Sequence, residues 1–405
     1  SLSGGPGQAA SDFYTAMAGA FSRVQRERDI VLVDQRGTGL SNPLSCEFPS
    51  DDELVELDSE QIRRVASQCL KSLQGDPRYY TTSVAVRDLD SVRTALGYER
   101  INLYGVSYGT RVAQHYLRRY PQRVRAAILD GVVPPEQIFG IEGALVAEQA
   151  LAQIFERCAS DDACHRAFPD PAAQFARLRA DIERKPAEVA IPDPSTAVVS
   201  RQPFRTAHLQ IAIRLLSYSP ERAALIPLLI DQAVAKRNLA PLVAQARMIA
   251  GQLDEALAVG MHNAVVCAED VPFFDRTAID RGALRGTYLG TSQLDGLIEI
   301  CKVWPRGPMD PDFHAPLMST VPTLLLSGSA DPATPASYAE RATRGLRNSL
   351  HLVLEGQGHG QLGVGCVPRL MAEFLALGSV QGLDAKCVRN ATPAPFFLSF
   401  AGPAP

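Results

Sequence analysis

The sequence predicts an α/β fold, a mostly parallel and doubly wound sheet with a mainly helical block inserted between two of its strands. Three observations predict it. Short apolar runs that end in Gly, Asp or Ser alternate with segments of helical periodicity. This alternation stops near residue 140 and resumes near residue 315. A G-x-S-x-G sequence follows one apolar run and precedes a helical segment.

The apolar runs fit buried parallel strands by their length and their β-branched content. They are 29–34, 101–105, 126–130, 321–327 and 350–355. Ligands bind at the carboxyl ends of parallel strands. We therefore look for functional residues directly after these runs.

Helices are predicted where apolar residues recur at spacings of three and four. A following Gly or Pro marks a helix end, and a Pro suits a first helical turn. The predicted helices are 85–96 before Gly97, 112–120 before Pro121, and 367–375 with Pro368 near its start.

The block between the two parts of the sheet is of a different kind. Residues 142–183 and 206–260 are rich in Ala, Leu, Gln and Arg at helical spacing. We divide the chain into a first core part, a helical cap and a second core part, at 1–140, 141–314 and 315–405. An insertion at this point would cover one end of the sheet, so it is a candidate lid. An independent helical domain is the alternative.

Composition excludes several classes of protein. Of 405 residues, 46% are hydrophobic and 21% charged, which is typical of a globular chain. The net charge of -4 implies no basic surface, so nucleic acid is not an expected partner. No apolar run is long enough to predict a membrane span.

The eight cysteines predict disulfides and an oxidising compartment, although eight buried thiols are the alternative. None forms a CxxC pair, and none lies near His at zinc-finger spacing, so no metal site is predicted. We prefer pairing in chain order: Cys46 with Cys69, Cys158 with Cys164, Cys267 with Cys301, and Cys366 with Cys387. A secreted or periplasmic location follows. The chain opens on SLSGGPG with no signal peptide, and we expect a truncated or processed start.

The strongest motif is Gly105-Val-Ser107-Tyr-Gly109, in the strand–turn–helix context of a nucleophile elbow. Glycines permit a tight turn that presents the Ser107 hydroxyl at the strand end. The following helix N-terminus favours developing negative charge there. An ordinary serine in a tight turn is the alternative.

A serine hydroxyl needs a base to take its proton. Among seven histidines, His359 is the candidate, because it lies in a glycine-rich loop after the last apolar run. The acid that orients it should be Asp331, since Asp331 also follows a strand and gives the order Ser, Asp, His. Asp130 ends another strand and is the rival acid. Asp34 more simply organises a turn.

The transition state also needs hydrogen-bond donors for its oxyanion. One should be the backbone N–H of Tyr108, directly after the nucleophile. The second should come from the Gly4-Gly-Pro-Gly7 loop, at Gly5, because glycine lets the backbone approach the substrate closely.

Together these motifs resemble the α/β-hydrolase superfamily, and within it the serine peptidases related to prolyl aminopeptidase and the secreted bacterial tripeptidyl aminopeptidases. The matching segments are 4–7, 34–39, 105–110, 130–131, 329–332 and 358–360. Prolyl aminopeptidases usually have His before the GGPG loop and Trp after the nucleophile. Here Ser3 and Tyr108 hold those positions, which favours the tripeptidyl type.

The resemblance implies a serine aminopeptidase that cleaves N-terminal peptide bonds and needs no metal or organic cofactor. Such an enzyme must hold a free α-ammonium group, for which a carboxylate at the junction of cap and core is suited. Glu269 and Asp270 are the candidates, with Cys267 available as a disulfide tether. Glu142 and Glu148 are alternatives, and a solvated acidic turn is the plain reading.

Two other functions remain open. A carboxylesterase or lipase-like hydrolase would use the same catalytic residues on an ester or small amide. A non-catalytic binding module of this fold would normally have lost one of them. The sequence does not define the oligomeric state.

Overall fold

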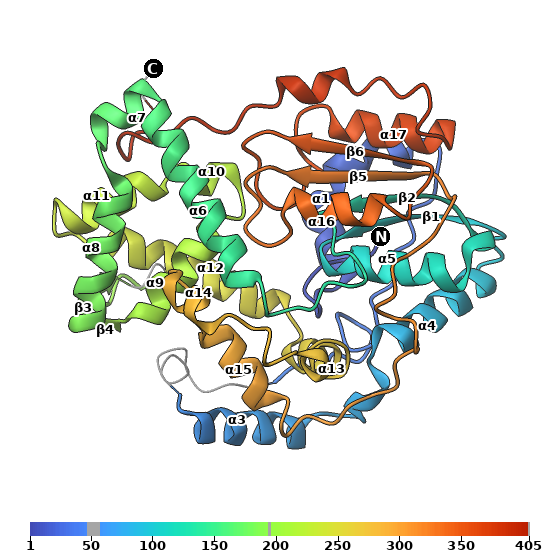
Figure 1. The fold of residues 1–405 in the computed structure, drawn as a ribbon, viewed down its shortest axis with the longest axis horizontal. Helices are drawn as coiled ribbons and strands as arrows, with labels where there is room; N and C mark the ends of the chain where they lie inside the picture. Colours follow the sequence, from blue (N-terminus) through green and yellow to red (C-terminus); the bar gives the residue numbers. More distant parts are fainter. Residues whose placement is uncertain (47–56, 193–195, 404–405) are drawn as a thin grey trace.

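The computed structural model describes residues 1–46, 57–192 and 196–403. Its centre is a four-stranded parallel sheet in the order β1-β2-β5-β6. Figure 1 shows helices around this sheet and a mostly helical block beside it. The predicted α/β class is confirmed. The strands are β1 (Ile101–Val106), β2 (Val124–Asp130), β5 (Thr323–Gly328) and β6 (Ser349–Leu354).

The register of the sheet brings the strand ends together. Val106 of β1 pairs with Asp130 of β2, and Asp130 pairs in turn with Leu326 of β5. Gly328 of β5 then pairs with Leu354 of β6. The carboxyl ends of all four strands therefore lie along one edge, from which the loops of interest leave.

The prediction of a strand at 29–34 is wrong, because this segment has no strand assignment. The Ser1 ammonium donates to the Val31 carbonyl at 3.2 Å, and Leu2 forms an isolated parallel bridge to Gly105. Residues 1–3 thus lie between this segment and β1. One bridge does not make the repeated hydrogen bonds that define a ladder, so the regular sheet ends at β1.

Helices cover both faces of the sheet, as a doubly wound fold requires. Side chains alternate along each strand, so Leu103 and Tyr104 belong to different apolar clusters. One face packs against α4 (Thr82–Ala95), α5 (Tyr108–Arg119) and α16 (Ala336–Thr343). The other packs against α1 (Ala10–Gln25) and α17 (Val367–Leu377). The three predicted helices correspond to α4, α5 and α17.

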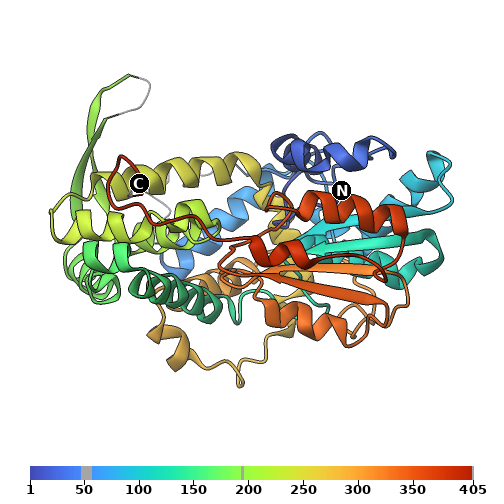
Figure 2. The ribbon, with the colours of Figure 1, turned by 90° about the horizontal axis from the view of Figure 1, so that it is seen from above.

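The chain between β2 and β5 is mainly helical and has its own apolar cluster. It also contains an antiparallel hairpin, β3 (Ala187–Pro192) and β4 (Val199–Phe204), which Figure 2 shows projecting from the block. Its helices are α6 (Gly143–Ser160), α7 (Asp162–Ala167), α8 (Pro171–Arg184), α9 (Thr206–Leu216), α10 (Pro220–Ala223), α11 (Ile226–Val234), α12 (Ala240–Ala256), α13 (Val259–Glu269), α14 (Arg281–Gly286) and α15 (Ser292–Ile300). The division at 140/141 and 314/315 remains a prediction.

The remaining regular elements are short or lie at the periphery. They are α3 (Ser59–Ser72) and the 3₁₀ turns η1 (Pro77–Tyr79), η2 (Pro121–Arg123), η3 (Val271–Phe273) and η4 (Lys386–Asn390). After η4 the chain returns to the helical block between β2 and β5, where Phe396 is buried and the Arg157 guanidinium lies 4.0 Å from the centre of its ring. Within the described ranges, no helix combines the length and hydropathy needed to cross a lipid bilayer.

All eight cysteines are paired in chain order, as expected from the sequence. The sequence separations are 23, 6, 34 and 21 residues. The Cys46–Cys69 and Cys267–Cys301 bonds belong to one buried cluster with Trp304, the only tryptophan of the chain. The first bond joins α3 to the loop at Cys46, and the second joins the last turn of α13 to Cys301, directly after α15.

Candidate active site

Ser107 lies in a tight turn between β1 and α5. Its backbone has φ 54° and ψ -124°, a conformation that is unusual for a residue with a side chain. Its N–H donates to the Asp130 carbonyl at 2.9 Å. A Cβ on Gly105 would lie 2.4 Å from the Gly109 carbonyl oxygen, so only glycine fits this crossing. The turn has the form that the G-x-S-x-G motif predicts.

His359 and Asp331 form a hydrogen-bonded pair in the loops after β6 and β5. The Nδ1 of His359 lies 2.8 Å from Oδ2 of Asp331. Asp331 also accepts the backbone N–H groups of Ala333 and Thr334, and the Thr334 hydroxyl, each at 2.8 Å. With Nδ1 donating to the carboxylate, Nε2 is left as the acceptor that a general base needs.

Electrostatics stabilises the charged forms of this pair. Burial alone would raise the pKa of Asp331, but the charge of His359 and the hydrogen bonds hold that pKa below its ordinary 3.8. Burial alone would lower the pKa of His359, but the Asp331 carboxylate outweighs it and raises the pKa above 6.5. The imidazole is therefore a stronger base than a free histidine.

The imidazole lies beside the residues that hold the elbow. Gly131 follows Asp130, and a Cβ on Gly131 would lie 3.1 Å from Cε1 of His359. Among the described residues, the Ser107 hydroxyl makes no hydrogen bond to His359. Catalytic hydrogen bonds are often long in a free enzyme and tighten with substrate, so this geometry is compatible with proton transfer from Ser107 to His359.

Asp130, the rival acid, occupies a different position. Its carboxylate accepts the Gln361 N–H at 2.8 and 2.9 Å and the Tyr104 hydroxyl at 2.9 Å. Burial raises the pKa of Asp130 to about 6. The position that orients the imidazole through Nδ1 is held by Asp331.

The loop that contains Gly5 lies against the elbow. A Cβ on Gly4 would be 3.2 Å from the Cβ of Ser107. The Ala258 N–H donates to the Gly7 carbonyl at 3.0 Å, and the His262 ring lies 3.2 Å from the Pro6 carbonyl oxygen. The start of α13 thus holds this loop beside Ser107. Tyr108, the other expected donor, is the first residue of α5.

Glu269 and Asp270 lie deep behind Tyr108. The Thr82 hydroxyl donates to Glu269 at 2.9 Å and lies 2.6 Å from the Tyr108 hydroxyl. Asp270 pairs with Arg111 at 3.1 Å. Burial raises the pKa of Glu269 to about 8. Both carboxyl groups are almost fully buried and have protein partners, so a substrate ammonium would have to displace these partners.

Two residues of the helical block between β2 and β5, which the sequence did not indicate, contact the loops of the pair. The backbone N–H of His359 donates to the Tyr218 carbonyl at 2.7 Å, and the centroids of the two rings lie 5.2 Å apart, edge to face. Arg214 of α9 donates to the Pro332 carbonyl at 2.8 Å. Their only sequence signal is an arginine in an apolar helix, which no motif marks.

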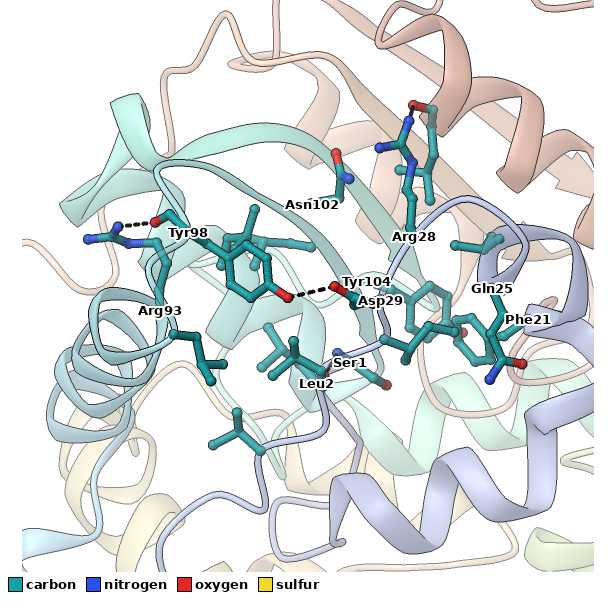
Figure 3. A pocket seen from close by; sticks show the side chains of 18 of the residues that line it. Ser1, Leu2, Phe21, Gln25, Arg28, Asp29, Arg93, Tyr98, Asn102 and Tyr104 are labelled. Carbon is teal, nitrogen blue, oxygen red and sulfur yellow. Dashed lines mark hydrogen bonds between the residues drawn. The ribbon is translucent and has the colours of Figure 1, made fainter.

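A separate cavity of about 590 Å³ lies beside residues 1–2, α1 and the start of β1. Figure 3 shows Tyr98 and Asp29 joined by a hydrogen bond in its wall. Its lining includes none of Ser107, Asp331 and His359. The described ranges also contain no group of three or more His, Cys, Asp or Glu residues suited to a metal ion.

The sequence is similar to one family model and to several known hydrolases and peptidases. The family model described as alpha/beta hydrolase fold matches residues 2–365. Serine protease Hip1 of Mycobacterium tuberculosis is 27% identical, over 95% of this chain and 79% of its own length. The tripeptidyl aminopeptidase of Streptomyces coelicolor is 25% identical, over 97% and 76%. Carboxylesterase B of M. tuberculosis is 26% identical, over 95% and 78%.

Solved structures are more distant. The proline iminopeptidase of Mycobacterium smegmatis is 15% identical over 93% of this chain and 88% of its own, with a TM-score of 0.40. A thermophilic esterase of Thermogutta terrifontis is 16% identical over 93% and 89%, with a TM-score of 0.39. These scores are too low to bear on the reaction.

Proposed function

Because the chain belongs to the alpha/beta hydrolase fold family, we propose that it is a serine peptidase acting at free N-termini, of the tripeptidyl or prolyl aminopeptidase type. The hydrolase and peptidase relatives support an enzyme of the serine hydrolase class. The observation that carries the proposal is the partly buried Asp331–His359 hydrogen bond at the sheet edge from which Ser107 projects.

In the proposed reaction, His359 Nε2 takes the proton of the Ser107 hydroxyl as its oxygen attacks the scissile carbonyl. The backbone N–H groups of Tyr108 and Gly5 stabilise the oxyanion, a contribution of about 10²–10³ in rate for one such donor. The imidazolium then protonates the departing amine, which leaves an ester on Ser107. Water, deprotonated by His359, hydrolyses this ester and releases the acid. Asp331 holds the ring and stabilises its charge throughout.

Aminopeptidase specificity rests on finding an acceptor for the α-ammonium group. Glu269 and Asp270 are the proposed acceptors, and the pairing of Asp270 with Arg111 argues for Glu269 of the two. Glu142 is the alternative in the cap, since its hydrogen bonds from Tyr338 and Gln137 both reach Oε2. Glu148 accepts the Tyr288 N–H.

Four variants separate these candidates: Glu269→Gln, Asp270→Asn, Glu142→Gln and Glu148→Gln. The true acceptor is the one whose loss raises KM for free-amine peptide arylamides and leaves KM for their acetylated forms unchanged. Unchanged KM in all four variants would reject a carboxylate acceptor.

We also propose that residues 141–314 form a cap over the site. Support comes from Tyr218 and Arg214, which reach from α9 and the turn after it to the loops of His359 and Asp331. A secreted or periplasmic location is proposed from the four disulfides, which persist in oxidising compartments.

A carboxylesterase is the second candidate, favoured by the likeness to carboxylesterase B. It would use the same reaction steps on an ester substrate. A panel of tripeptidyl and aminoacyl arylamides, free and acetylated, together with simple esters, distinguishes the two. Fast cleavage of free-amine arylamides supports the aminopeptidase, whereas indifference to acetylation with fast ester cleavage supports the esterase.

The least active alternative, a binding module without catalysis, is tested by a fluorophosphonate probe. We expect it to label wild-type protein at Ser107 and to spare Ser107→Ala. If the probe fails to label folded wild-type protein, the non-catalytic binding module is favoured instead.

A further inference from the structure

Asp130 is bonded to both loops of the proposed catalytic site. Its backbone carbonyl accepts the Ser107 N–H at 2.9 Å, and so holds the elbow. Its carboxylate accepts the Gln361 N–H at 2.8 and 2.9 Å, two residues after His359. This carboxylate does not orient the imidazole, because Asp331 holds that position.

The Asp130 carboxyl group is buried and hydrogen-bonded to a second element, β1. The side chain is fully buried, and the Tyr104 hydroxyl of β1 donates to it at 2.9 Å. A buried carboxyl group is expensive unless it is well hydrogen-bonded. Gly131, the next residue, leaves just enough room for the imidazole, because a Cβ there would lie 3.1 Å from it.

We propose that Asp130 is a positioning residue of this hydrolase, which holds the histidine loop in register with the nucleophile elbow and adds a second negative charge behind the imidazole. Its role resembles neither the orienting acid nor the oxyanion donors, because it acts on His359 through the backbone of Gln361 and through its charge.

The groups that face His359 define the expected effect on proton affinity. Asp331 comes from the loop after β5, Asp130 from β2, Arg214 from α9, and the Tyr218 ring from the turn after α9. Burial lowers the pKa of His359, Asp331 and more weakly Asp130 raise it, and Arg214 lowers it. Removing the charge of Asp130 should therefore lower the pKa of His359.

Asp130→Asn tests this with little steric change. The amide oxygen can still accept the Gln361 N–H, and the amide nitrogen can donate to the Tyr104 phenol oxygen, so the charge is what is lost. We expect the acid limb of the kcat/KM profile to move to lower pH by about half a unit, less than the effect of a directly paired charge. Changes should fall on kcat rather than KM.

A second variant protects the test against misfolding. Tyr104→Phe removes one donor to Asp130, which disfavours its charged form, so the acid limb should move the same way by less. Tyr98→Phe is the matched control. It removes an equivalent hydrogen bond, the one of 2.8 Å from the Tyr98 hydroxyl to Asp29, which lies outside the proposed catalytic site. It should leave the profile unchanged.

The titration of the His359 ring, followed by NMR and assigned with His359→Gln, gives a readout independent of turnover. An unchanged ring titration in both Asp130→Asn and Tyr104→Phe overturns the inference. Only the expected change in the kcat/KM profile rests on the proposed function. Failure of the proposed function looks different: no substrate is cleaved and Ser107 is not labelled, while the ring titration still reports on Asp130.

Discussion

At the scale of single residues, the turn at Ser107 depends on two glycines and a strained backbone. Ser107 has a positive φ, which typically costs about 1–3 kcal/mol and persists only where packing enforces it. That packing is close, since a Cβ on Gly109 would lie 2.2 Å from the Leu2 carbonyl oxygen. The strand end, the elbow and residues 1–3 are thus fitted to one another.

Gly109→Ala should therefore displace the elbow and greatly reduce both stability and activity. We expect a loss of at least about 10²-fold in kcat/KM, because a displacement of about 1 Å in a catalytic group can have that effect. Gly19→Ala in α1 is the control, because nothing lies within 4 Å of its added Cβ. It should raise stability by about 0.5–1 kcal/mol and leave activity unchanged.

The raised pKa of His359 fixes the direction of the pH dependence. Its ring must be neutral to accept the Ser107 proton, so kcat/KM should fall on acidification with an acid limb above pH 6.5. Asp331→Asn should move this limb to lower pH and reduce kcat by about 10⁴-fold. An acid limb that stays in place in Asp331→Asn would contradict the assignment of the acid.

Buried Glu269 should make stability depend on pH in the opposite way to an ordinary carboxylate. Its pKa is about 8 in the folded state against 4.5 as a reference, so the unfolded chain loses its proton first. Stability from this group is complete below about pH 4.5 and is lost as pH rises through 8. Glu269→Gln should flatten the decline of the melting temperature between these values. Glu60→Gln, at an exposed position, is the control. If the melting temperature of Glu269→Gln declines with pH as steeply as that of the wild type, the claim is refuted.

The sequence predicted several of these residues because their signals are local. The G-x-S-x-G motif marks Ser107, a glycine-rich loop after a strand marks His359, and a strand end marks Asp331. The sequence preferred Asp331 and kept Asp130 as the rival acid, since both end strands, and it is the three-dimensional placement that distinguishes their contacts with His359. Tyr218 was missed because its contact uses a backbone carbonyl, which any residue could supply.

At the scale of elements, the strands were predictable where they are buried and the hairpin was not. All six residues of β5 are buried, which gives a continuous apolar run. By contrast, the first three residues of β4 are exposed, and only Val199 among them is apolar, so no strand pattern arises. The segment 29–34 has a strand-like sequence but lacks a neighbour with which to form a ladder.

Contacts between elements also give a prediction for α9. Arg214→Met keeps the length of the side chain but loses the bonds to the Pro332 and Gly143 carbonyls. We expect kcat/KM to fall by about tenfold with folding retained, because hydrogen bonds from charged groups contribute about 1.5–3 kcal/mol. Arg157→Met, which loses a similar bond to Ala394 on the far side of the cap, should leave activity unchanged. Equal activities of the two variants would argue against a role for α9 in the site.

At the scale of the whole molecule, the disulfides contribute unequally to stability. By loop closure, the Cys267–Cys301 bond, with a separation of 34 residues, should contribute about 4 kcal/mol. The Cys158–Cys164 bond, with a separation of 6, should contribute about 2 kcal/mol. Serine replacements of each pair, compared by denaturant unfolding, measure these values. Trp304 is a suitable fluorescent probe because it is buried. Equal losses for the two pairs would contradict the loop-closure account.

The order of the disulfides has a consequence for how the protein is made. Each cysteine is joined to the next one along the chain or to the one before it, and no bond encloses another. A polypeptide that emerges into an oxidant from its amino end can therefore complete every cross-link before the following thiol arrives. Such a chain has little need for the reshuffling that interleaved bridges demand, and its biogenesis should tolerate the loss of a disulfide isomerase.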